Sequence, residues 1–211
     1  MSKILEQIAE ELQEGNRDEL VTLVKQALDQ GLDAGEILNG GLLKGMDVVG
    51  ERFRENEIFV PQVLMSARAM SAGAEALKPY LTGKAAEKKG KICMGTVKGD
   101  LHDVGKNIVI MLFEGKGFDV VDLGVDVPAE KFVETAIKEN CDIIGCSSLL
   151  TTTMPVMGEI VEAAEKAGIR DKVKIMVGGA PVTADFAASI HADTYTPDAA
   201  SAADTALNLM G

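Results

Sequence analysis

The most informative segment of the chain is Lys91-Ile92-Cys93-Met94-Gly95-Thr96-Val97, which continues after Lys98 as Gly99-Asp100-Leu101-His102-Asp103-Val104-Gly105. The first seven residues form an apolar run typical of a buried strand, and the second seven are typical of a turn from a strand into a helix. Ligands bind at the carboxyl ends of parallel strands, so a histidine here is a candidate functional residue. Because residues at i and i+2 of an extended segment point the same way, Asp100 can reach the His102 ring.

The pairing of aspartate and histidine suits a metal ligand. A carboxylate that accepts the proton of one imidazole nitrogen fixes the tautomer and raises the basicity of the other nitrogen. Taken alone, Asp100 and His102 could also be a loop ion pair or an acid/base couple. The chain has two histidines, and no His, Cys or carboxylate cluster with zinc-like spacing lies nearby, which disfavours an all-protein metal site. A metal that arrives inside a macrocycle needs only one protein ligand.

The C-terminal half alternates between strand-like and helical patterns. Apolar runs occur at 91–97, 118–124, 142–149 and 174–178, with a short fifth strand near 194–196. Helical stretches follow Val104, Glu130, Met154 and Thr183, and a last helix ends the chain. Such alternation predicts a parallel sheet flanked by helices, in a Rossmann-like domain of flavodoxin type over residues 91–211. The fold class is therefore α/β.

Residues 1–82 instead show four segments with apolar residues at helical spacing, which predicts a four-helix bundle. The second segment begins near Asn16 or Asp18, a new one begins after Gly31-Leu32-Asp33, and Pro61 is placed at the first position of the fourth helix. Three glycines weaken the third segment unless a backbone or a ligand packs closely there: Gly40, Gly41 and Gly45. The charged stretch at 83–90 is interpreted as a linker between domains.

Composition narrows the function classes. The chain has 211 residues, of which 46% are hydrophobic, and a net charge of −12, which argues against a nucleic-acid partner. No window has the apolar length of a membrane span, and the N-terminus begins an acidic amphipathic helix rather than a signal peptide, which favours a cytoplasmic protein with no membrane partner. The three cysteines are predicted to be buried thiols: Cys93, Cys141 and Cys146.

Three motifs in the same order as in a known family extend this interpretation. The sequence from Asp100 to Gly105 resembles the DxHxxG signature of cobalamin-binding domains. Gly145–Thr153 resembles the SxL segment of that family, and Val177–Ala180 resembles its GG segment. The resemblance implies a cobalamin cofactor, and with it a cobalt ion.

The helical half resembles the cap module of methionine synthase and of the small corrinoid proteins that serve methanol, methylamine and aryl-ether methyltransferases. The stretch that carries this resemblance is Phe59–Met70. Met and Leu at helical spacing usually fill a core, so an ordinary bundle helix is the alternative. As a cap, Phe59 and Met65 would cover the upper cobalt face and exclude water from it.

The resemblance also implies how the cofactor is held. Cobalamin would release its dimethylbenzimidazole, and His102 would ligate cobalt in its place, the base-off/His-on state. Asp100 would hold the other ring nitrogen, and Thr153 would supply the hydroxyl where methionine synthase has a serine. Glycines would let the backbone approach the buried nucleotide tail. The remaining implied cofactor-binding residues are Asp103, Gly105, Ser147, Leu149, Thr151, Gly178 and Gly179.

The implied function is a non-catalytic methyl carrier. It would accept a methyl group on Co(I) from a substrate-specific methyltransferase and pass it from methyl-Co(III) to a methyl-acceptor methyltransferase, with a reductive activase as a third partner. Candidate donors are methanol, methylamines, methyl thiols and methoxylated aromatics, and candidate acceptors are tetrahydrofolate and coenzyme M. The alternatives are the cobalamin subunit of a radical mutase, which would not need a cap, and a cobalamin-dependent sensor, which usually carries an output module.

Overall fold

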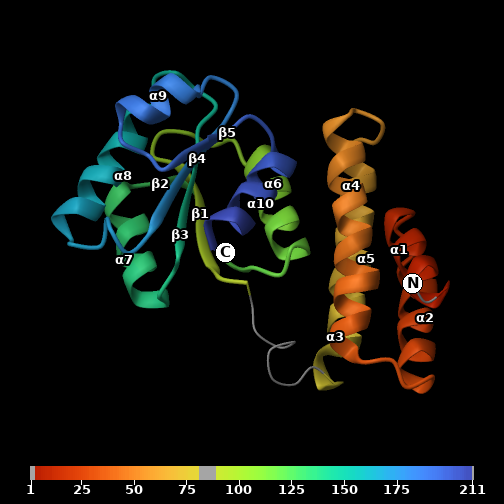
Figure 1. Ribbon diagram of the computed structural model, residues 1–211. Coiled ribbons are helices and arrows are strands. Elements are labelled where there is room, and N and C mark those ends of the chain that lie inside the picture. The colour runs from red at the N-terminus through yellow and green to blue at the C-terminus, as the bar shows by residue number, and fades with distance from the viewer. Residues whose placement is uncertain (1–2, 81–88, 211) are drawn as a thin grey trace. The chain divides into compact units, whose positions relative to one another are not determined.

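The computed structural model describes residues 3–80 and 89–210 (Figure 1). The chain divides into two compact units, and, apart from residues 115–117, the division along the sequence falls between residues 88 and 89. Most of the predicted linker, residues 83–88, lies outside the described residues, so the linker stays a prediction.

The elements of the N-terminal unit are all helices over its described residues. Its elements are α1 (Lys3–Gln13), α2 (Arg17–Asp29), α3 (Ala34–Ile37), the π-helix η1 (Leu38–Leu43), α4 (Lys44–Arg54), α5 (Val60–Leu77) and the 3₁₀ turn η2 (Lys78–Tyr80). The third predicted helix is thus three consecutive elements, α3, η1 and α4. Asp33 caps its start, because its Oδ1 accepts hydrogen bonds from the backbone N–H groups of Gly35 and Glu36 at 2.9 and 3.2 Å.

The glycines of this third helix lie where it packs against α1. A Cβ atom added to Gly41 would lie 2.8 Å from Ile8 Cγ2, and one added to Gly45 would lie 2.9 Å from the Ala9 carbonyl oxygen. Close helix packing therefore accounts for residues that weaken helix propensity. The start of α5 differs from the prediction. It begins at Val60, so Pro61 is the second helical residue.

The C-terminal unit contains a five-stranded parallel sheet with helices between the strands. Its strands are β1 (Lys91–Val97), β2 (Asp119–Val127), β3 (Ile143–Ser147), β4 (Lys174–Gly178) and β5 (Thr194–Thr196). Its helices are α6 (Val104–Gly115), α7 (Ala129–Glu139), α8 (Pro155–Lys166), α9 (Ala184–Ser189) and α10 (Ala199–Met210). The strand order is β2-β1-β3-β4-β5 with every pair parallel, the flavodoxin-type order, so the predicted α/β class is confirmed.

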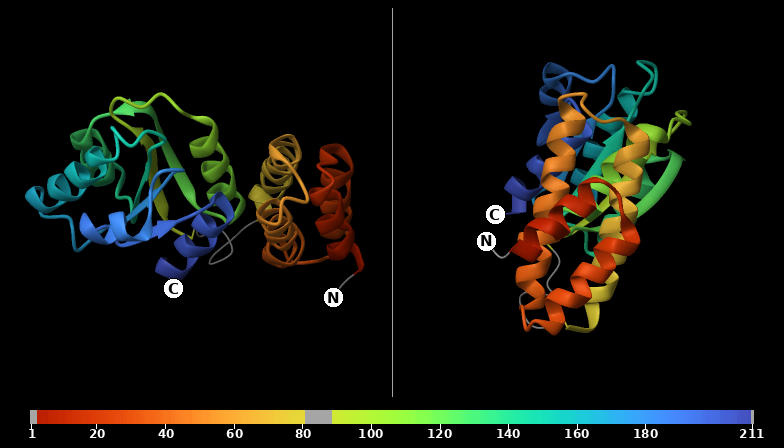
Figure 2. Two further views of the ribbon diagram at one scale, coloured as in Figure 1. Left: turned by 90° about the horizontal axis from the view of Figure 1, so that it is seen from above. Right: turned by 90° about the vertical axis from the view of Figure 1, so that its right-hand side faces the viewer.

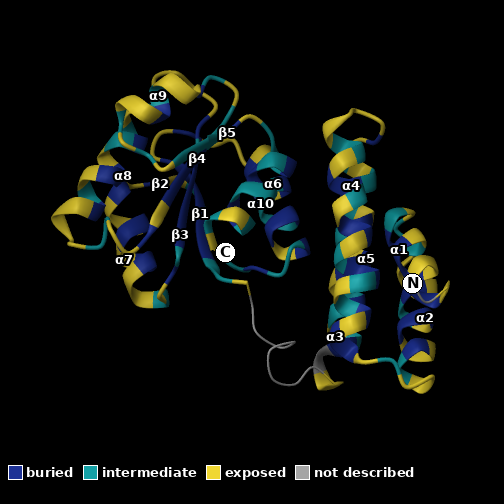
Figure 3. Cartoon of the chain, viewed as in Figure 1, coloured by how far each residue is buried: buried dark blue, intermediate teal, exposed yellow. Residues whose placement is uncertain are grey.

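Helices cover both faces of this sheet (Figures 1 and 2). One core lies between the sheet and α7, α8 and α9, and α6 and α10 lie on the other face. The central strands are buried on both sides, as Figure 3 shows in dark blue. This layering explains why the strands read as continuous apolar runs. It also confirms the prediction for the cysteines, since Cys93, Cys141 and Cys146 are buried free thiols.

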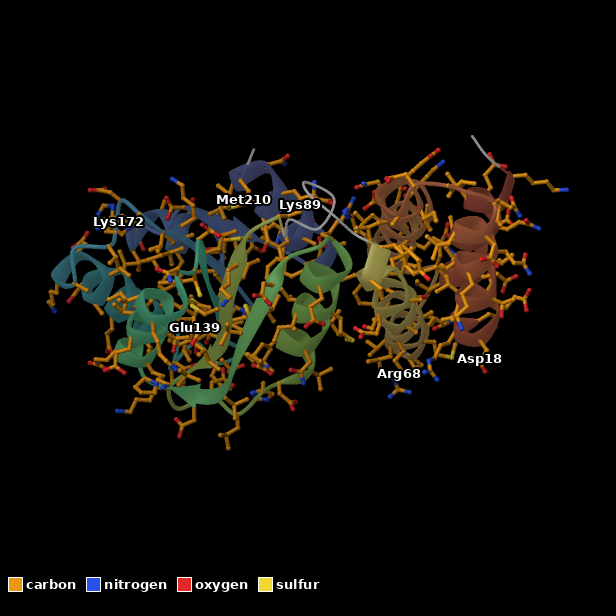
Figure 4. The ribbon with its side chains drawn as sticks, turned by 90° about the horizontal axis from the view of Figure 1, so that it is seen from below. Asp18, Arg68, Lys89, Glu139, Lys172 and Met210 are labelled. Carbon is orange, nitrogen blue, oxygen red and sulfur yellow. The ribbon has the colours of Figure 1, made fainter. Side chains whose placement is uncertain are left out.

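Ion pairs at the amino end of β1 join the strand to its neighbours. Lys91 Nζ lies 3.3 Å from Glu139 Oε2 at the end of α7, where Figure 4 labels Glu139, and 3.6 Å from Asp119 Oδ2 on β2. The site residues lie at the opposite, carboxyl ends of the strands. Over residues 3–80 and 89–210, no helix is both long and apolar enough to cross a membrane.

Candidate functional site

The candidate site is built from loops at the carboxyl ends of β1 and β3. These two strands are neighbours at the centre of the sheet, and the chain leaves them in opposite directions, β1 toward β2 and β3 toward β4. Such a switch point is where open α/β sheets bind ligands. The loop after β1 leads into α6 and is held in place by Thr96, whose Oγ1 donates a hydrogen bond of 2.7 Å to the His102 carbonyl.

The Asp100 carboxylate orients the His102 ring. Asp100 Oδ1 lies 2.8 Å from His102 Nδ1 and also accepts a 3.0 Å hydrogen bond from the His102 backbone N–H. The Asp100 side chain is fully buried, whereas the His102 side chain is 54% exposed. With Nδ1 held as the N–H donor, Nε2 carries the lone pair and is the nitrogen that can bind a metal.

The second oxygen of Asp100 is held by the loop after β3. Oδ2 accepts a 2.6 Å hydrogen bond from Leu149 N, a 3.3 Å bond from Leu150 N and one of 3.3 Å from Thr153 Oγ1. Burial raises the pKa of the Asp100 carboxyl, but the hydrogen bonds from Leu149, His102 and Leu150 together lower it to about 2. The carboxylate is therefore charged near neutral pH and serves His102 as an acceptor.

Thr153 is joined by a residue that the sequence interpretation missed. Its Oγ1 lies 2.8 Å from Ser148 Oγ and 2.9 Å from the Leu150 carbonyl oxygen. Ser148 is fully buried, and its hydroxyl donates to the same carbonyl at 3.1 Å. The signal in the sequence is the pair of serines at the end of β3, of which the SxL resemblance indicates Ser147. Ser148 is the member that enters the hydroxyl network.

The predicted glycines differ in what surrounds them. Gly179 has a φ of +130°, and a Cβ atom there would lie 1.8 Å from the Ser148 carbonyl oxygen, so this glycine is required by the loop after β3. A Cβ atom at Gly178 would lie 3.3 Å from the Thr196 carbonyl oxygen. At Gly105 it would meet nothing within 4 Å, so the protein fold itself does not require a glycine there.

The surface around His102 suits a flat apolar ligand. Leu101 is 71% exposed and Val104 is 64% exposed on either side of the histidine, and Asp103 is exposed as well. Among the described residues, no group of three or more His, Cys, Asp and Glu side chains could hold a metal ion. One oriented imidazole within an exposed apolar surface fits a macrocycle that brings its own metal. The residues present therefore fit a corrinoid.

The structure brings part of the predicted set together. Asp100, His102, Leu149 and Thr153 form one hydrogen-bonded cluster. The other residues of that set in the C-terminal unit lie in the same loops or at the strand ends beside them: Asp103, Gly105, Ser147, Thr151, Gly178 and Gly179. A surface groove of about 490 Å³ between α7 and α8 shares no residue with this cluster.

Phe59 and Met65 belong to the N-terminal unit. Phe59, just before α5, is 64% exposed and Met65 within α5 is 46% exposed, whereas Val63 and Ala69 of α5 are fully buried in the bundle. Gln62 Oε1 accepts a 2.9 Å hydrogen bond from the Phe59 backbone N–H, an interaction that fixes the start of α5. The predicted cap side chains are thus on the surface of the bundle and do not fill its core.

Comparison with known proteins identifies the family of this chain. Residues 90–206 match a family model described as a B12 binding domain, and residues 4–78 match a second model with the same description. Dimethylamine corrinoid protein 1 of Methanosarcina acetivorans is 42% identical over 213 residues, which cover all of both chains. The chain therefore belongs to the family of corrinoid proteins with B12 binding domains.

Two solved structures have the same fold over the length of this chain. A cobalamin-binding protein from Desulfitobacterium hafniense superposes with a TM-score of 0.83 and 31% identity, covering 98% of each chain. A chain of the methanol:cobalamin methyltransferase complex from Methanosarcina barkeri gives a TM-score of 0.86 and 34% identity, covering 99% of this chain and 80% of that one. The family resemblance and the fold expected from the sequence are both confirmed.

Proposed function

We propose that this protein binds a corrinoid and carries a methyl group between two methyltransferases. The observation that carries the proposal is the fixed His102 ring at the switch point of a B12 binding domain. A relative that is 42% identical is a dimethylamine corrinoid protein, and a structural neighbour belongs to a methanol:cobalamin methyltransferase complex. These relatives favour a methyl carrier over the subunit of a mutase or a sensor.

His102 is the proposed metal ligand, in the base-off/His-on arrangement. The corrinoid, when bound, supplies a cobalt centre that can take up and release a methyl group. Asp100 keeps a proton on Nδ1 and so presents Nε2 as the donor atom. Leu149 N and Thr153 Oγ1 keep the carboxylate in place. Because these contacts exist within the chain itself, the ligand is oriented before any cofactor arrives.

The other predicted residues receive supporting roles in this proposal. Asp103 and Gly105 lie at the exposed start of α6, beside the ligand. Five residues at the ends of β3 and β4 would line the pocket of the nucleotide tail: Ser147, Leu149, Thr151, Gly178 and Gly179. Phe59 and Met65 would cover the upper face of the cofactor and limit its contact with water.

The chain is proposed to act as a carrier rather than as a catalyst. Its partners would be a substrate-specific methyltransferase, a methyl-acceptor methyltransferase and a reductive activase. The structural neighbour from the methanol:cobalamin complex supports a partner of the first kind. The activase and the acceptor enzyme rest on the family resemblance, as does the cytoplasmic location.

Two matched variants test the ligand. The chain has one further histidine, His191, which is exposed and far along the sequence from the site. His102→Asn and His191→Asn make the same chemical change, and Asn tolerates the positive φ of His191. Apoprotein loaded with cobalamin would be reduced to Co(II) and measured by paramagnetic resonance at neutral pH.

The expected result is nitrogen coupling from an imidazole in the wild type and in His191→Asn, and its loss in His102→Asn. Coupling from dimethylbenzimidazole in the wild type, or no nitrogen coupling at all, would contradict the proposed ligation. Methyl transfer from methanol and from mono-, di- and trimethylamine, each with its cognate methyltransferase, would then identify the donor.

A further inference from the structure

The carboxyl-terminal half of β2 does not follow β1 in simple register. Met94 pairs with Asp122, but the next residue of β1, Gly95, pairs with Gly124. A second shift follows before Val97, so β2 contains an extra residue at each of two steps. Bulges are rare between parallel strands, and bulges near functional sites redirect side chains.

Left-handed backbone and one carboxylate shape this irregular segment. Gly124 and Asp126 have φ angles of +82° and +56°. Asp122 Oδ1 accepts a 2.8 Å hydrogen bond from Gly124 N and lies 2.6 Å from the buried Lys106 Nζ of α6. Aspartate is among the few residues besides glycine that adopt a positive φ without large strain. The segment is therefore held in this shape by specific contacts.

The shape places Asp126 against the loop that carries the candidate ligand. Asp126 Oδ1 accepts a 2.7 Å hydrogen bond from Gly99 N, and Asp126 N donates one of 3.0 Å to the Asp100 carbonyl oxygen. Asp100 is thus fixed from two sides. The loop after β3 holds its carboxylate through Leu149, and the end of β2 holds its backbone.

We propose that Asp126 is a positioning residue for the His102 metal ligand and acts through Asp100. This inference rests on the corrinoid function proposed above. If the backbone at Gly99 and Asp100 moved, the carboxylate would no longer lie 2.8 Å from Nδ1, and the ring could rotate or change tautomer. The irregular register of β2 is then the structural device that brings Asp126 to this loop.

Three variants separate the effect of losing the acceptor oxygen of Asp126 from the effect of changing a residue with a positive φ. Asp126→Gly accepts the positive φ but removes the acceptor oxygen, and Asp126→Asn keeps both the oxygen and the tolerance of that φ. Asn140→Gly is the matched control, because Asn140 is exposed, has a φ of +53° and ends α7 away from the site. Each full-length protein would be loaded with cobalamin and reduced to Co(II).

The measured quantity is the fraction of Co(II) that shows imidazole nitrogen coupling, followed as pH falls. Loss of an interaction that orients a metal ligand weakens ligation by about tenfold. Protons compete for Nε2, so the midpoint for losing the histidine should rise by about one pH unit in Asp126→Gly. Asp126→Asn and Asn140→Gly should keep the wild-type midpoint.

The failure of this inference is distinguishable from the failure of the proposed function. A wild-type protein without imidazole coupling contradicts the proposed corrinoid function. In that case the role of Asp126 is tested in the apoprotein. In the apoprotein, ¹⁵N shifts of His102 should show a wild-type ring protonated on Nδ1 and a mixed tautomer in Asp126→Gly. A wild-type midpoint in Asp126→Gly, or an equal change in Asn140→Gly, would overturn the role of Asp126.

Discussion

The two units of the chain carry their candidate functional residues in opposite ways. In the C-terminal unit, buried polar groups of the chain itself hold His102. In the N-terminal unit, Phe59 and Met65 are exposed apolar side chains. A polar geometry can be complete in the apoprotein, whereas an exposed apolar side chain acts only when another surface covers it. Changes to the residues that hold His102 should therefore alter the apoprotein, whereas changes at Phe59 and Met65 should act on the loaded protein.

The largest effect on the apoprotein is expected at Gly179. Gly179→Ala would place a Cβ atom 1.8 Å from the Ser148 carbonyl oxygen, on a backbone whose φ is +130°. The free energy of unfolding should fall by on the order of 3 kcal/mol, as for other severe clashes at a strained φ. Urea denaturation of the apoprotein measures this change.

Gly105→Ala is the matched control for that variant. Gly105 lies at the start of α6, where an added Cβ atom would have no other atom within 4 Å. The apoprotein should keep its stability or gain up to about 1 kcal/mol. If its affinity for cobalamin falls at the same time, Gly105 serves the cofactor. If Gly179→Ala unfolds no more easily than Gly105→Ala, the close contact with Ser148 does not exist in solution.

A smaller effect, which depends on pH, is expected from Asp100. The folded pKa of about 2 lies below the usual value of about 3.9, so the charged carboxylate stabilises the fold. Its contribution, on the order of 2 kcal/mol, is complete above about pH 5 and is lost as the pH falls through about 2. The stability gap between wild type and Asp100→Asn should therefore narrow between pH 5 and 2. Acid titration of urea unfolding in both apoproteins would show it, and a constant gap would contradict the low pKa.

The smallest effect on stability is expected in the predicted cap. Phe59→Ala and Met65→Ala should each change the free energy of unfolding by about 0.5 kcal/mol or less, because both residues are exposed. Val63→Ala, at a fully buried position of the same helix, should cost about 1–3 kcal/mol. In the loaded protein, the cap variants should instead speed photolysis and oxidation of bound methylcobalamin. Unchanged rates of photolysis and oxidation would contradict a cap role for Phe59 and Met65.

Much of the fold could be predicted because it follows from local patterns. The alternation of strand and helix in the C-terminal half needs only the periodicity of apolar residues, and all five strands overlap the predicted runs. The end of β2 differs, because this strand continues to Val127, three residues beyond the run predicted at 118–124. The contact between Asp100 and His102 joins residues two positions apart, so it could also be predicted from the sequence. The bundle helices were predicted in the same way, but the π-helix at Leu38–Leu43 was not, because the spacing of apolar residues does not distinguish it from an α-helix.

Local sequence patterns predicted the alternating strands and helices and the contact between Asp100 and His102, because each of these depends on residues close together in the chain. The contacts that hold Asp100 in place, by contrast, come from long-range packing. Leu149 and Asp100 are hydrogen-bonded although they lie 49 positions apart in the sequence, and Asp126 and Gly99 although they lie 27 apart. Both hydrogen bonds therefore depend on which strands become neighbours in the sheet. The position of Asp126 depends in addition on two shifts in the register between β1 and β2, and no local pattern of apolar residues encodes those shifts.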